Sequence, residues 1–149
     1  MIRNEISTVI DAPFDKVWAY VTDPGNWSQW SASKVPPEAE FTRPIGVGSV
    51  ISVTTHLMGK RTLSGTITDW EPGRKFAFRS NAMGADITEV WSVDQVEGNK
   101  TKLTKSSQVQ IGGFMRLFQW YLSSKTKEIA STQFAKIKQN MEAKNTPVV

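Results

Sequence analysis

The feature that most constrains the fold of this 149-residue chain is a change of hydrophobic period near its C-terminal end. Over residues 114–141 apolar side chains recur at helical spacing and mark one broad stripe. They are Phe114, Leu117, Phe118, Tyr121, Leu122, Ile129, Phe134, Ile137 and Met141. The predicted helix has roughly 28 residues and is about 42 Å long, at ~1.5 Å per residue. A helix with such a stripe needs a partner surface that covers it.

The region before this helix alternates between apolar and polar residues with a period of two. The alternation extends from about residue 40 to residue 109 and predicts β-strands. Turn-forming segments at residues 46–48, 58–60, 71–74, 81–84 and 97–99 divide it into six strands. Neither this meander nor the helix can bury its apolar face alone, so we expect the sheet to curl around the helix.

The first 30 residues predict one further strand and two short helices. Residues 5–10 alternate in the manner of a strand. Asp11 and Pro13 suit the start of a helix, and a second short helix is expected at residues 27–30. We therefore expect a single α+β domain over residues 1–149, with a curved antiparallel seven-stranded sheet around the long C-terminal helix.

The composition excludes several kinds of site. The chain has no cysteine, which excludes disulfides, thiolate chemistry and zinc–sulfur sites. His56 is the single histidine and is expected to face outward, so it cannot serve as the base of a serine triad. An acidic cluster for a metal is also not visible. We expect no metal and no cofactor.

Hydropathy and the N-terminal residues predict a cytoplasmic protein. No apolar run approaches the ~20 residues that span a bilayer, and the first residues do not resemble a signal peptide.

The formal net charge is +4, with the densest group of lysines on the C-terminal helix. We interpret that group as a solvated helix face, with a nucleic-acid or membrane surface as the alternative. We expect no nucleic-acid partner, no stable membrane insertion, and a monomer or weak homodimer.

Residues 10–30 carry the motif I-x-A-P-x-x-x-V-W-x-x-V-T-D-P-x-x-W-x-x-W. This motif resembles the N-terminal signature of the polyketide cyclase/dehydrase and lipid-transport family, part of the START-like (SRPBCC) helix-grip superfamily. Gly48, the turn at residues 68–74, the strand around Trp91 and the turn at residues 98–101 extend the resemblance. It implies the helix-grip fold and a cavity for sterols, lipids, polyketides or plant hormones, with catalysis in only some members.

Strand direction in the meander places three segments at one end of the sheet. Its second, fourth and sixth strands lead into residues 58–60, 81–84 and 111–114. These segments carry glycines, methionines and an aromatic residue, which suit a mobile apolar surface. We expect this end to be the cavity mouth, although turn geometry alone also explains the glycines.

Strand alternation places two charged residues, Glu89 and Lys105, on the concave face of neighbouring strands. A buried charge needs a partner, and a Glu89–Lys105 pair is the simplest one. The alternative is a β-bulge that turns one of the two toward solvent, because bulges are common in strongly bent sheets.

The residues expected to line the cavity come from the concave strands, the second short helix and the start of the long helix. They are Trp30, Val53, Thr55, Leu57, Met58, Phe76, Phe78, Met83, Glu89, Trp91, Lys105, Ser107, Phe114, Leu117, Phe118 and Tyr121.

These residues lead to a functional hypothesis with two alternatives. We expect the protein to bind or transport an apolar or amphipathic small molecule, such as a lipid or a polyketide. One alternative is a cofactor-free cyclase- or dehydratase-type enzyme with Glu89 as its acid–base group. The other is a protein-interaction module with the same fold.

Overall fold

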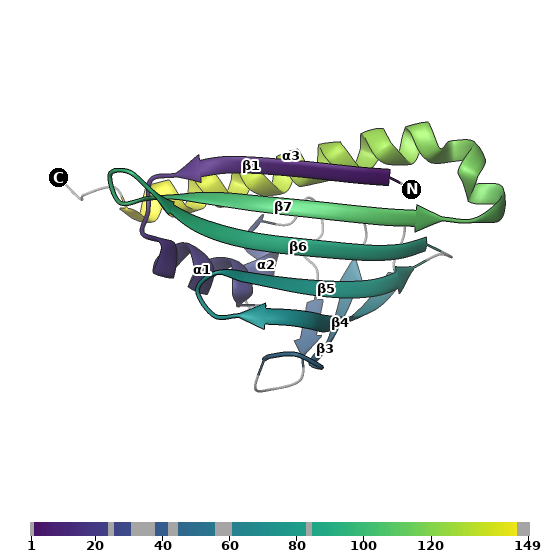
Figure 1. Ribbon diagram of the computed structural model, residues 1–149, viewed down its shortest axis with the longest axis horizontal. Coiled ribbons are helices and arrows are strands. Elements are labelled where there is room, and N and C mark those ends of the chain that lie inside the picture. Colours follow the sequence, from purple (N-terminus) through teal and green to yellow (C-terminus); the bar gives the residue numbers. More distant parts are fainter. Residues whose placement is uncertain are drawn as a thin grey trace.

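The computed structural model of the chain describes residues 2–23, 26–30, 38–41, 45–55, 61–82 and 85–145. In chain order the elements are β1 (Ile2–Ile10), α1 (Phe14–Thr22), α2 (Trp27–Trp30), β2 (Glu38–Phe41), β3 (Val50–Thr55), β4 (Arg61–Glu71), β5 (Lys75–Ala82), β6 (Ala85–Val96), β7 (Lys100–Ile111), the 3-10 helix η2 (Gly113–Phe118) and α3 (Gln119–Asn145) (Figure 1).

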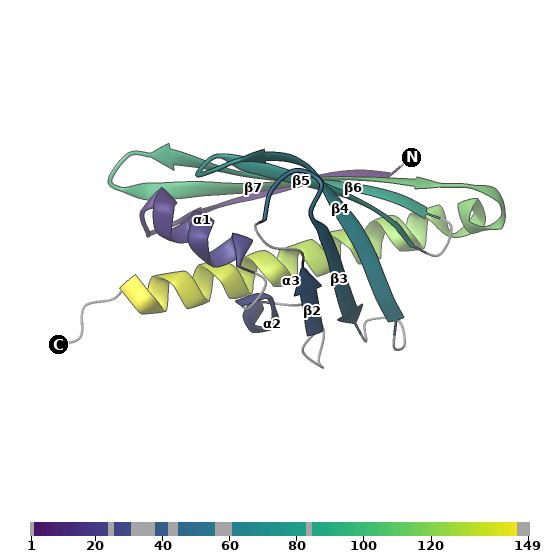
Figure 2. The ribbon, with the colours of Figure 1, turned by 90° about the horizontal axis from the view of Figure 1, so that it is seen from below.

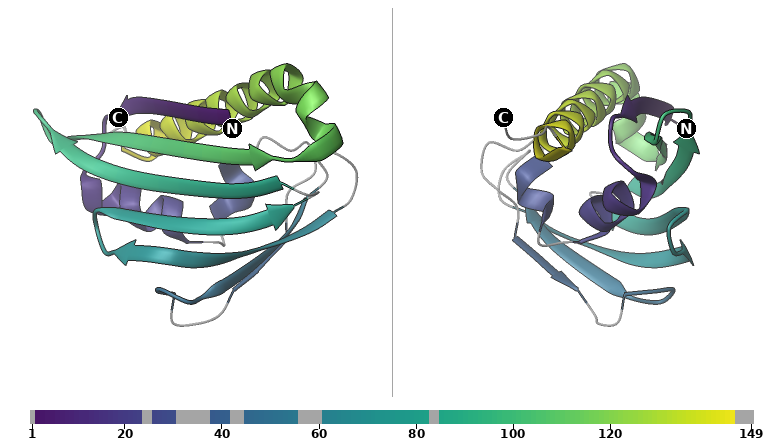
Figure 3. Two further views of the ribbon diagram at one scale, coloured as in Figure 1. Left: turned by 45° about the vertical axis from the view of Figure 1, so that its right-hand side comes forward. Right: turned by 90° about the vertical axis from the view of Figure 1, so that its left-hand side faces the viewer.

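The strands form one antiparallel sheet in the order β1-β7-β6-β5-β4-β3-β2. Each strand from β2 to β7 pairs with the next one in the sequence, whereas β1, near the start of the chain, pairs with β7, the last strand. The sheet curves so that α3 lies along its inner side, with α1 and α2 beside the C-terminal half of that helix (Figures 2 and 3). The expected α+β fold, with a curved antiparallel sheet and a C-terminal helix, is confirmed.

The apolar residues of the concave face, α1 and α3 form one core. Its fully buried side chains come from every layer, since they include Ile10 of β1, Val17 of α1, Leu103 of β7 and Ile137 of α3. Burial of an aliphatic side chain of this size contributes about 1.5–3 kcal/mol to folding. The helix and the sheet therefore stabilise each other, as the two hydrophobic periods predicted.

Within the described strand pairs, the register shifts once, between Ile67 and Asp69 on β4. A β-bulge of this kind bends its strand and increases the local twist. The register of β6 against both β5 and β7 continues without a shift. The bulge expected as an alternative on the strands of Glu89 and Lys105 is therefore absent from β6 and β7, and both residues keep their inward parity.

The start of the C-terminal helix differs from the prediction. A 3-10 helix occupies the first residues, and α3 begins at Gln119. Leu117, Phe118 and Tyr121 are exposed there, whereas Phe134 is buried. The single stripe over residues 114–141 was therefore wrong at its N-terminal end. An apolar side of a helix is buried only where another element covers it, and α3 packs mainly on β1 and α2.

Candidate functional site

Four residues of β6 and β7 place polar atoms on the concave face of the sheet. Glu89 is the Cα partner of Ser107, and Trp91 is the partner of Lys105. Residues two apart on a strand point to the same side, and Trp91, Lys105 and Ser107 are all buried on the side that α3 covers. The two strands thus bring a carboxylate, an ammonium, a hydroxyl and an indole together in a largely apolar interior.

Lys105 and Glu89 form an ion pair inside the fold. The Nζ atom of Lys105 lies 3.4 Å from Oε1 of Glu89, and the two side chains are only 6% and 19% exposed. The same Nζ donates a hydrogen bond of 2.9 Å to Oε1 of Gln133 on α3. The predicted pairing is confirmed, and the lysine additionally links the sheet to the helix.

Trp91 completes the partners of the Glu89 carboxylate. Its Nε1–H donates a hydrogen bond of 3.1 Å to Oε2 of Glu89. The Nζ atom of Lys105 lies 5.2 Å from the centroid of the Trp91 ring, within the range of a cation–π interaction. Both carboxylate oxygens thus have a donor or a cation nearby, which compensates the desolvation of a buried charge.

An aromatic cluster surrounds this polar group. Phe76 stacks on Trp91 with a centroid distance of 6.1 Å and an interplanar angle of 6°. The rings of Trp30 and Phe134 tilt against Trp91 at 5.5 Å and 5.6 Å. Phe78 packs against the same core and is the Cα partner of Glu89 on β5. The ion pair therefore lies next to a cluster of aromatic rings that pack on one another.

Asn4 adds a polar group that sequence reasoning missed. It is the Cα partner of Ser107 on β1, so Asn4, Ser107 and Glu89 lie in one row across three strands. Its Nδ2 and Oδ1 atoms are shielded from solvent, and neither has a hydrogen-bond partner among the described residues. Strand parity with Ile2 and Ile6 placed Asn4 inward and was the available signal. An unsatisfied buried amide costs about 1–3 kcal/mol, which a bound partner would offset.

The remaining residues that were expected at the site are either exposed or not among the residues that the structure describes. Leu117, Phe118 and Tyr121 are exposed at the helix start and do not belong to the buried core that contains Trp91. Leu57, Met58 and Met83 lie outside the described residues, as do the side chains of Val53, Thr55 and Phe114. The expected mouth is described only in part: β3, β5 and β7 run in one direction and end at the same end of the sheet.

No metal site was expected, because the sequence shows no acidic cluster and His56 is its single histidine. In the part of the chain that the structure describes, no group of three or more His, Cys, Asp or Glu residues could hold a metal ion. His56 itself lies outside that part.

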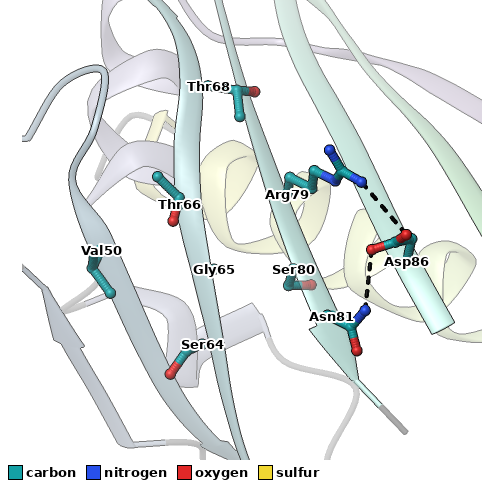
Figure 4. Close-up of a pocket in the computed structure, with 9 residues that line it drawn as sticks. All are labelled: Val50, Ser64, Gly65, Thr66, Thr68, Arg79, Ser80, Asn81 and Asp86. Atoms are coloured by element: carbon teal, nitrogen blue, oxygen red, sulfur yellow. Dashed lines mark hydrogen bonds and ion pairs between the residues drawn. The ribbon is translucent and has the colours of Figure 1, made fainter. Parts of the chain in front are cut away.

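Two surface depressions lie away from the cluster. One, of about 340 Å³, is on the face of the sheet opposite α3 (Figure 4). In it Asp86 accepts a hydrogen bond of 3.2 Å from Asn81 and pairs with Arg79 at 3.4 Å, so its charged groups satisfy one another. The other, of about 470 Å³, is beside Tyr20 and the C-terminal part of α3. The concave cluster is the better candidate, because its amide lacks a partner and its charges are buried.

Comparison with known proteins gives the family and the fold. A family model described as polyketide cyclase/dehydrase and lipid transport matches residues 1–142. No curated protein matches the sequence. The chain is similar in structure to the di-domain ARO/CYC protein BexL from the BE-7585A biosynthetic pathway, with a TM-score of 0.80 and 16% identity over 99% of this chain and 48% of that one.

Two further solved structures have the same fold. The di-domain ARO/CYC protein StfQ from the steffimycin biosynthetic pathway has a TM-score of 0.80 and 11% identity over 97% of this chain and 51% of that one. A conserved protein from Geobacillus kaustophilus has a TM-score of 0.72 and 18% identity over 95% of each chain. The chain thus spans about half the length of the two di-domain proteins. Since the family model covers nearly all of the sequence, the chain belongs to the polyketide cyclase/dehydrase and lipid-transport family.

Proposed function

We propose that the protein binds an apolar or amphipathic small molecule, such as a lipid or a polyketide, between the concave face of the sheet and α3. The polar atoms of the ligand would meet Glu89, Lys105, Ser107 and Asn4. The observation that carries the proposal is the Asn4 amide, whose donor and acceptor atoms are both buried without a partner among the described residues, in one row with Ser107 and Glu89.

The chemistry of these groups defines what the ligand would offer. The amide of Asn4 donates through Nδ2 and accepts through Oδ1, so it pairs with a group that both accepts and donates, such as a hydroxyl beside a carbonyl. The rings of Trp30, Phe76 and Trp91 make the interior beside the ion pair apolar, which suits a carbon skeleton. A ligand with oxygen atoms at one edge and an apolar body fits both requirements.

A cyclase- or dehydratase-type enzyme is the second candidate. Within β5, β6 and β7, Glu89 is the one acidic residue with inward parity. It would accept a proton from the carbon next to a ligand carbonyl, while the Lys105 ammonium would stabilise the negative charge that develops on the oxygen. Binding remains the preferred proposal, because Lys105 and Trp91 already engage both oxygens of Glu89.

Native mass spectrometry of freshly purified protein tests the binding proposal. The expected result is a non-covalent adduct that disappears on denaturation, together with binding of a hydrophobic dye to the folded protein. Asn4→Leu should reduce the adduct, and Asn81→Leu is the matched control, since Asn81 lies on the outer face of the sheet. A wild-type protein with neither adduct nor dye binding would contradict the proposal.

A further inference from the structure

The junction between the sheet and α3 exposes an unusual cluster of large apolar side chains. Eight large apolar residues are exposed in the described part of the chain, and four of them lie within residues 117–121. Leu117 is 68% exposed and Trp120 is 75% exposed, and they are accompanied by Phe118 and Tyr121. We call Leu117, Phe118, Trp120 and Tyr121 the aromatic tip.

The aromatic tip projects from one end of the molecule. Strand β7 ends at Ile111, and the chain turns through η2 before α3 returns beside β1 (Figure 1). The rings of Trp120 and Tyr121 contact each other edge to face, with centroids 6.1 Å apart. Leu117, Trp120 and Tyr121 are separated by three and four positions in consecutive helical turns, so their side chains lie on one side of the chain and form a contiguous apolar surface.

The residues that flank the aromatic tip in the sequence carry positive charge. No aspartate or glutamate occurs in residues 98–127, whereas Arg116, Lys125 and Lys127 flank the tip. Arg116 and Lys127 are exposed, and Lys125 lies 3.8 Å from Glu128, the first acidic residue after the tip. The surface therefore combines exposed tryptophan, tyrosine and leucine with a local excess of cations.

We propose that the aromatic tip docks the protein reversibly on an anionic lipid bilayer surface. Tryptophan and tyrosine favour the membrane–water interface because each has an apolar ring and a polar group. Cations beside them attract anionic headgroups. In the described part of the chain no helix is long and apolar enough to cross a membrane. The tip inserts side chains into the interfacial layer, and the domain stays outside the bilayer.

Vesicle flotation with the full chain tests this proposal. Vesicles of pure phosphatidylcholine are compared with vesicles that contain about one third phosphatidylglycerol, at low and high salt. The variant Leu117→Ser/Trp120→Ser removes the tip's most exposed apolar groups. Val47→Ser is the matched control, because Val47 is as exposed as Leu117. Val47 precedes β3 whereas the aromatic tip follows β7, and β3 and β7 run in the same direction, so the two sites lie at opposite ends of the strands. Thermal unfolding checks that each variant is folded.

The expected result is binding to the anionic vesicles, with at least a ten-fold weaker apparent affinity for Leu117→Ser/Trp120→Ser and no change for Val47→Ser. High salt and Arg116→Gln/Lys127→Gln should weaken binding as well, since both reduce attraction to the headgroups. The proposal is overturned if no vesicle binds, or if pure phosphatidylcholine binds equally well. It is also overturned if the wild type is a dimer that the tip variant dissociates without any vesicle binding, because the tip would then contact a second copy.

Discussion

The ammonium nitrogen of Lys105 lies 3.4 Å from a carboxylate oxygen of Glu89, although the two residues are diagonal neighbours on adjacent strands and both are largely buried. The helix takes part in this pair, because Gln133 accepts a hydrogen bond from the same nitrogen. Lys105 thus contacts both Glu89 on the sheet and Gln133 on the helix. A substitution at Lys105 is therefore expected to change both the stability of the core and the environment of the Glu89 carboxylate.

The first prediction concerns the coupling within this pair. Lys105→Met leaves the Glu89 charge without its cation, and the loss of unfolding free energy should be about 3–5 kcal/mol, as for other half-broken buried pairs. Glu89→Met should also destabilise. The double variant Glu89→Met/Lys105→Met should lose less than the sum of the two single changes, because no buried charge remains. Urea denaturation of the four proteins measures the coupling, and additive losses would show that the pair does not interact.

The second prediction separates binding from catalysis at Glu89. If Glu89 is an acid–base group, Glu89→Gln should lower product formation by about 10²–10⁴-fold and leave ligand affinity nearly unchanged. If it only positions the ligand, affinity should fall and there should be no turnover in the wild type. Calorimetric affinity and product analysis of the wild type and Glu89→Gln give the answer. We expect weaker binding, and unchanged affinity together with lost turnover would favour the enzyme.

The third prediction compares two phenylalanines of the C-terminal region. Phe134 is 3% exposed and packs on Trp91, so Phe134→Ala should cost about 3–5 kcal/mol of unfolding free energy. Phe118 is 44% exposed, and Phe118→Ala should cost less than about 1 kcal/mol because little buried area is lost. Chemical denaturation measures the unfolding free energy of both variants, and the substitution is Phe→Ala in each. Equal losses would show that the helix start packs on the core.

The fourth prediction concerns pH and Tyr20. Burial raises the pKa of Tyr20 above its ordinary value of about 10, and the hydrogen bond from Asn140 partly opposes this. Between the unfolded and the folded pKa, the unfolded chain has lost the phenol proton while the folded protein retains it. The unfolded state then binds fewer protons, so the Tyr20 contribution to stability is present below about pH 10 and is lost as pH rises through the folded pKa.

The measurement is the unfolding free energy of the wild type and Tyr20→Phe at several values between about pH 8 and pH 11. The difference between the two proteins should be constant at the lower values and should shift against the wild type above about pH 10. Other groups titrate equally in both proteins, so they cancel in the difference. A difference that is independent of pH would show that Tyr20 is not more protonated in the folded protein.

The sequence alone predicted the order of strands and helices and the inward face of β6 and β7. The period of two placed Glu89, Trp91 and Lys105 on one side of the sheet, and the same parity applied to Asn4. Apolar residues recur with a period of two before residue 112 and at helical spacing after it, which predicted a sheet that covers a helix. These features are local, because the side-chain direction depends only on the backbone of the same strand or helix.

The tertiary structure decided which of these inward residues meet. Pairing of β1 with β7 joins residues about one hundred positions apart and brings Asn4 beside Ser107, and the placement of α3 brings Gln133 to Lys105. The tertiary structure also left Leu117 and Phe118 exposed, although the apolar stripe of the helix predicted that both would be buried. A side chain is buried only where another element covers it, and the position of that element depends on long-range pairing that local periodicity does not contain.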